Sequence, residues 1–152
     1  GSNIPARKGA SDYSEVQWWI EVATTVGTTA RDITVDYENQ SGASGSTVVS
    51  VGGSTNAGVA PRMVQIVPAS GDSIREVVST QLATGLASGT YRVIATRFIS
   101  DIMAAAANAV VNADWALLGL PVIEDDACLM LACLTATTVS GTNVGSLKFV
   151  TG

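Results

Sequence analysis

The sequence predicts an all-β protein folded as a β-sandwich, with one short helix or long connection around residues 101–126. Apolar and polar residues alternate with a period of two over several short stretches, a pattern typical of strands that bury one face. These stretches recur at spacings of roughly 8–15 residues and are separated by segments rich in Gly and Ser. A count of about eight such strands predicts a jelly-roll-like topology, the most economical eight-stranded sandwich.

The first half of the chain contains the clearest alternation. Residues 1–13 mix Gly, Ser, Pro and charged residues without a period, which predicts an extended N-terminal arm ahead of a single sandwich domain over residues 14–152. A strand begins at Glu15, and the GGSTNAG segment predicts a flexible loop further on. The other strands expected in this half are Arg31–Asn39, Thr47–Val51 and Arg62–Val67.

Two further strands, Ile74–Leu82 and Thr90–Phe98, follow a turn at Ser70–Ser73. The ATGLASG segment between them is short and rich in small residues. It predicts that the two strands form a hairpin.

The two-residue alternation of apolar and polar residues ends after residue 100. Asp101–Asn112 contains four consecutive alanines and begins with an N-capping residue, so a short apolar helix is expected there. Asp114–Asp126 is expected to be a long connection, because Gly and Pro interrupt it. Ala127–Ala136 is a continuous apolar run, typical of a central strand covered on both faces, and Gly145–Val150 is expected to be the last strand.

The charge content is low for a protein of this size. Charged residues make up 14 % of the 152 residues and apolar residues 47 %, whereas a soluble domain usually has about 25 % charged residues. With so few charged residues, a large part of the surface must be formed by uncharged residues. We therefore expect neighbouring subunits to cover part of that surface.

Several classes of chemistry are disfavoured. The chain has no histidine, which removes the commonest general base and the commonest transition-metal ligand. Cys128 and Cys133 lack zinc-site spacing and are expected to be buried, unpaired thiols. The net charge of −5 disfavours nucleic acid as a partner. Acidic residues and Pro121 interrupt the least polar stretch, Ile99–Ile123, so no membrane partner is expected. No motif for a cofactor is present either, so no cofactor is expected.

Two acidic groups are candidate sites. Glu124–Asp126 could contribute to a calcium site but lacks the alternating spacing of a dedicated loop, so a solvated turn is the preferred interpretation. Asp32, Asp36 and Glu38 share one strand face, as the paired carboxylates of a glycoside hydrolase could. No aromatic residues cluster near that face, so no catalytic residue is expected, and Arg or Lys from adjacent strands should pair with these acids.

The remaining candidates belong to contacts between subunits. Trp18 and Trp19 must face opposite sides of their strand, so one is expected in the core and the other on the surface, either facing solvent or, preferably, anchoring an interface. Arg outnumbers Lys, and Arg favours partly buried ion pairs and interfaces, although intrachain salt bridges explain any single Arg equally well. The candidate interface residues are Arg7, Lys8, Tyr13, Trp19, Arg62, Arg75, Arg92, Arg97 and Trp115.

Three segments together resemble a family of proteins. They are DITVDYENQSGASGST, with its T-V-x-Y-x-N-Q-x-G strand and turn, the segment from PRMVQIV through GDSIREV to YRVIATRFIS, and DWALLGLPVIEDDACLMLACL. Together they are similar to small structural proteins of tailed-bacteriophage virions. The similarity extends over residues of roughly 30 to 135, and its motifs are turns and strands rather than chemistry.

The resemblance implies a non-enzymatic virion protein, most simply a capsid decoration (cement) protein assembled in the bacterial cytoplasm. Such proteins commonly form homotrimers, bind the major capsid protein on the outside of the head and stabilise it. A tail, collar or fibre component that binds glycans or a cell surface is the alternative. Subunits are expected to exchange arms or add strands through residues 1–13 and the exposed sheet edges.

Overall fold

The computed structural model describes residues 11–27, 29–52, 62–83, 88–101, 114–119 and 128–130. The chain divides into two compact units, residues 1–122 and residues 123–152, and all the described strands belong to the first unit. The elements are β1 (Val16–Thr24), β2 (Arg31–Asn39), β3 (Ser44–Val51), β4 (Arg62–Ile66), β5 (Ile74–Leu82), β6 (Thr90–Arg97) and α1 (Trp115–Leu118).

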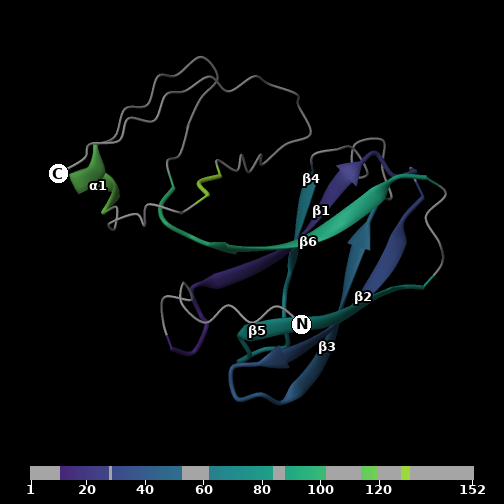
Figure 1. Cartoon of the computed structure of the whole chain (residues 1–152), viewed down its shortest axis with the longest axis horizontal. Coiled ribbons are helices and arrows are strands. Elements are labelled where there is room, and N and C mark those ends of the chain that lie inside the picture. Colours follow the sequence, from purple (N-terminus) through teal and green to yellow (C-terminus); the bar gives the residue numbers. More distant parts are fainter. Residues whose placement is uncertain are drawn as a thin grey trace. The chain divides into compact units, whose positions relative to one another are not determined.

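The six strands form two three-stranded antiparallel sheets (Figure 1). In the first sheet, β1 lies between β4 and β6, and Trp19 stands opposite Gln65 on one side and Ile94 on the other. In the second sheet, β2 lies between β3 and β5. The protein is thus all-β over the described strands, in an arrangement compatible with a β-sandwich.

Both sheets contribute to one hydrophobic core. The period of two places every second residue of β1 and β2 inside, and Ile20 and Ile33 are 0 % exposed. The Trp18 indole N–H donates a hydrogen bond of 3.0 Å to the carbonyl oxygen of Ile74, which links β1 to β5 of the other sheet. The buried members of this core are Trp18, Ile20, Ile33, Val35, Tyr37, Val49, Val51, Ile66 and Ile74.

The alternation predicted most strand bounds well. The bounds of Arg31–Asn39 and Ile74–Leu82 are confirmed at both ends. The strands that begin at Arg62 and Thr90 each end one residue earlier than expected. The strand expected at Thr47 begins at Ser44 instead, because the β2–β3 turn is tighter than its Gly and Ser content indicated.

The predicted hairpin between β5 and β6 is wrong. These consecutive strands lie in different sheets, where β5 pairs with β2 and β6 pairs with β1. The connection between them therefore passes from one sheet to the other. Small residues permit a tight turn. They do not determine whether the two flanking strands pair with each other or with strands from elsewhere in the chain.

The predictions for the last third were less successful. One helical turn, Trp115–Leu118, lies where a long connection was expected. Cys128–Met130 forms no strand and is exposed, so the central strand is wrong at these residues and so is the burial of Cys128. A short apolar run does not by itself distinguish a strand from other structures. The predicted helix after Asp101, Cys133 and the last strand lie outside the described residues.

Candidate interaction surface

A tight hairpin turn over residues 40–43 connects β2 to β3. The Asn39 N–H donates to the Ala43 carbonyl oxygen at 2.9 Å, and the Gly42 N–H donates to the Asn39 carbonyl oxygen at 2.9 Å. Gly42 has φ +83°, a left-handed conformation that closes such a loop. The Asn39 side-chain oxygen accepts hydrogen bonds from the backbone of Ser41 and Ala43, which fixes the turn before any distant contact is made.

This hairpin is tied to a second turn, just before β5. The Asp72 carboxylate accepts hydrogen bonds from the Tyr37 hydroxyl at 3.3 Å and from the Asn39 side-chain amide at 3.1 Å. The Tyr37 hydroxyl also accepts one from the Ala69 N–H at 3.0 Å. Gln40 adds two bonds, one to Gly71 and one from Ser73. These contacts join the turn after β2 to the turn before β5.

We expect Tyr37→Phe to lower the free energy of unfolding by about 1–3 kcal/mol. The substitution keeps the buried ring but leaves the Ala69 N–H without its acceptor and Asp72 without one donor, and unpaired groups in partly buried positions are costly. Urea denaturation measures the change. Thr34→Val, on the other face of β2, is the control and should change stability little; a similar loss in both variants would contradict the assigned role of the hydroxyl.

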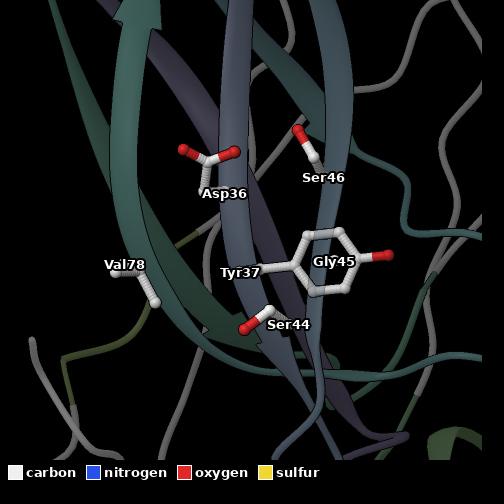
Figure 2. Close-up of a pocket in the computed structure, with 6 residues that line it drawn as sticks. All are labelled: Asp36, Tyr37, Ser44, Gly45, Ser46 and Val78. Carbon is white, nitrogen blue, oxygen red and sulfur yellow. The ribbon is translucent and has the colours of Figure 1, made fainter.

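A shallow groove of about 380 Å³ lies over the same hairpin. Figure 2 shows Asp36 and Ser46 on neighbouring strands above it, and the Tyr37 ring across Gly45. Among the described residues that line the groove, Asp36 supplies the single carboxylate and Tyr37 supplies a phenol. The groove therefore lacks the paired carboxylates that glycoside hydrolysis needs.

The acids of β2 are held within their own sheet. Ser79 donates a hydrogen bond of 2.7 Å to Asp36, Ser50 donates one to Asp32, and Arg75 forms an ion pair of 2.8 Å with Glu38. Pairing with Arg is thus confirmed for Glu38, whereas the bonds described for Asp32 and Asp36 come from neighbouring serines, and pairing of these two acids with Arg or Lys stays a prediction. Among the described residues, no three Asp, Glu, Cys or His side chains are grouped as metal ligands. Glu124–Asp126 lies outside the described residues.

The outer face of the other sheet combines apolar and polar side chains, because Trp19 lies opposite Ile94 and Gln65 there and the Glu21–Arg92 ion pair shares the face. Trp19 lies at its centre, half-buried, and its indole N–H donates a hydrogen bond of 2.9 Å to the Thr96 hydroxyl. Ile94 on β6 and Met63 on β4 share this face by register. We call Trp19, Met63 and Ile94 the Trp19 face. Trp18 is in the core, so the prediction that the two tryptophans divide between core and surface is confirmed.

Two strongly exposed apolar residues lie at one end of this sheet. Val67 directly follows β4 and is 62 % exposed, and Phe98 directly follows β6 and is 55 % exposed. Both strands run antiparallel to β1, so both end beside its beginning. The sequence did not single out Val67, Phe98, Met63 or Ile94, although their positions in the alternation could have indicated an apolar outer face.

Three of the candidate arginines have partners inside the chain. Arg75 pairs with Glu38, Arg92 with Glu21, and Arg97 with Glu15 at 2.8 Å. Each pair joins neighbouring strands of one sheet or the residue just before a strand. These partners do not exclude a role at an interface, but they account for the arginines without one.

The other candidates are placed as follows. Tyr13 is 9 % exposed and has φ +62°, so most of its side chain is buried in the chain rather than offered to a partner. Arg62 is exposed at the start of β4. Trp115 is the first residue of α1. Arg7 and Lys8 lie outside the described residues.

We expect the Glu21–Arg92 pair to contribute to the pH dependence of stability. The hydrogen bond from Arg92 lowers the pKa of Glu21 below its ordinary value, so the contribution is complete above that ordinary value and is lost as the pH falls through the lowered one. Glu21→Gln should therefore flatten the loss of stability in acid relative to wild type. Urea denaturation at neutral and acidic pH tests this, and an unchanged acid slope in Glu21→Gln would contradict it.

No protein family, curated protein or solved structure was found to match this chain. The described part of the chain also contains no helix with the length and apolar character needed to cross a membrane.

Proposed function

We propose that the protein is a non-enzymatic structural protein of a tailed-bacteriophage virion, and that it acts as a capsid decoration protein. It forms a closed homo-oligomer, for which the resemblance implies a trimer. It binds the major capsid protein on the outside of the head. The complete domain is an eight-stranded, jelly-roll-like sandwich, of which the six described strands are part.

The observation that carries the proposal is the Trp19 face in a chain with so little charge. On this face Trp19 lies opposite Ile94, with Met63 diagonal to it beyond Gln65. Val67 and Phe98 are exposed at the end of the same sheet, so several apolar side chains gather on a face that also carries polar ones. Trp is enriched at the energetic centres of protein interfaces. Only 14 % of the residues are charged, so little charge repulsion opposes association through this surface.

The described surface supports an assembling protein better than an enzyme. The groove beside Asp36 has no second carboxylate, and the serine hydroxyls near it have no histidine to activate them. The Tyr37–Asp72 contacts hold two turns together and leave the tyrosine hydroxyl fully engaged. The segments on which the resemblance rests thus contribute contacts that stabilise the domain.

The number of copies in purified particles tests the proposal. Quantitative mass spectrometry of gradient-purified phage that carries the protein should find a copy number comparable to that of the major capsid protein. Antibody labelling in the electron microscope should then mark the head. A few copies per particle, with label on the tail, would favour the tail or fibre alternative and call for a glycan array. Absence from the particle would contradict both.

A further inference from the structure

Strand β3 forms one edge of its sheet as far as the structure describes it, and its own residues include no charge, proline or bulge. It pairs with β2 on one side through eight residue pairs without a register shift, from Arg31–Val51 to Glu38–Ser44. It contains no charged residue and no proline over Ser44–Val51. Natural proteins commonly protect an exposed edge with charge, proline, a bulge or a short strand.

The other edges in the described sheets are protected. β4 has five residues and is followed shortly by Pro68, which cannot donate a ladder hydrogen bond. β5 has two register shifts against β2 and carries Arg75 and Glu76. β6 carries two arginines. Among the edges of the described strands, β3 is the one whose own residues carry no such protection.

The turn before β3 determines which backbone groups point outward. The hydrogen bond from Asn39 N–H to the Ala43 carbonyl sets the phase of the ladder, so Gly45, Thr47, Val49 and Val51 bond to β2. The N–H and C=O groups of the alternate residues therefore point away from the sheet. Their side chains are exposed, and these outward residues are Ser44, Ser46, Val48 and Ser50.

We propose that β3 pairs antiparallel with β3 of a second copy of this chain, around a twofold axis near Thr47. Ser46 then lies opposite Val48 of the partner subunit, and Ser44 lies opposite Ser50 of the partner subunit. Every outward N–H and C=O of the two strands finds a partner in this register. The β3-β2-β5 sheets of the two copies join into one continuous sheet that contains six of the described strands.

A second copy fits this edge for two reasons. The four outward residues are uncharged and evenly spaced, so an identical edge meets them in a symmetric register without charge repulsion. The nearest acids, Asp32 and Asp36, lie one strand back and already accept hydrogen bonds from serines of their own sheet. If the Trp19 face forms an oligomer, this contact joins two such oligomers and doubles the number of subunits. The proposal does not depend on the virion role.

Two matched substitutions test the edge. Val48 and Val78 are 59 % and 57 % exposed on opposite outer strands of the same sheet. Val48→Lys would place two like charges on diagonal positions about 7–8 Å apart across the twofold axis, whereas Val78→Lys would not. Ser46→Pro removes an outward N–H and keeps the bonds between β3 and β2.

Sedimentation equilibrium of the full chain gives the decisive readout. We expect the mass of Val48→Lys and of Ser46→Pro to be half that of wild type, and the mass of Val78→Lys to equal that of wild type. Far-UV circular dichroism and thermal melting establish that each variant is folded. A Val48→Lys mass equal to that of wild type, or a wild type that stays monomeric, would overturn the proposal.

If Ser46→Pro fails to fold, amide hydrogen exchange of the wild type at several protein concentrations provides a second test. In wild type, the Ser44, Ser46, Val48 and Ser50 amides should become protected as the protein concentration rises. The amides of Gly45, Thr47, Val49 and Val51 should be protected at all concentrations, because they bond to β2. Outward amides that exchange at the same rate at every concentration would contradict pairing at this edge. A different partner on this edge would protect these amides only when that protein is added.

Discussion

Replacing Trp18 with alanine is expected to lower the free energy of unfolding by about 3–5 kcal/mol, which is the usual cost of removing a large buried aromatic side chain. Trp18 is 5 % exposed and belongs to the core shared by the two sheets. Its indole also donates the hydrogen bond to Ile74 that links β1 to β5, so the substitution removes a tie between sheets as well as apolar contact. Urea denaturation followed by circular dichroism measures the loss.

The adjacent tryptophan provides a matched control. Trp19→Ala removes the same side chain from the other face of the same strand, where it is half-buried and bonded to Thr96. We expect a loss of about 1–2 kcal/mol, in line with the smaller apolar area that leaves water. Its larger effect should be on assembly. Equal destabilisation by the two substitutions would contradict the division of the tryptophans between core and surface.

Gly45→Ala is expected to destabilise the protein by about 3 kcal/mol through a steric clash. A Cβ at Gly45 would lie 2.5 Å from the Tyr37 ring, its cross-strand neighbour. The ring cannot move aside easily, because it is 1 % exposed and its hydroxyl is held by Ala69 and Asp72. Thermal and urea denaturation measure the effect.

A second glycine separates this steric cost from conformational strain. Gly71 has φ +87°, and no atom lies within 4 Å of a Cβ built there. Gly71→Ala should therefore cost only about 1 kcal/mol, from the left-handed backbone alone. In a Tyr37→Ala background, the penalty of Gly45→Ala should largely disappear while that of Gly71→Ala remains. If the Gly45→Ala penalty persisted there, the clash with the ring would not be its cause.

The sequence predicted local structure well where burial alternates strictly. In Arg31–Asn39, the inward Ile33, Val35 and Tyr37 are all buried, and both strand ends were correct. The strand content and the separation of Trp18 from Trp19 also follow from a period of two. These features depend on neighbouring residues along one strand, which a sequence displays directly.

The sequence could not show contacts that depend on distant partners. Tyr37 and Asp72 meet only because β2 and β5 are neighbours in one sheet, which their separation of 35 residues does not indicate. The same limit explains the wrong hairpin between β5 and β6. The partners of the acids on β2 were also unpredictable in part, since a serine and an arginine are equally available to a carboxylate until the register is known.

The mass of the full chain in solution tests the central proposal most directly. Light scattering coupled to size exclusion should give a mass several times 15.5 kDa, and this assembly should persist on dilution to about 1–10 µM, as a specific interface of standard size would. Trp19→Ala should reduce that mass while the strands remain folded. A wild-type protein that elutes as a uniform 15.5 kDa species at every concentration would contradict the proposal that this chain works as an assembly.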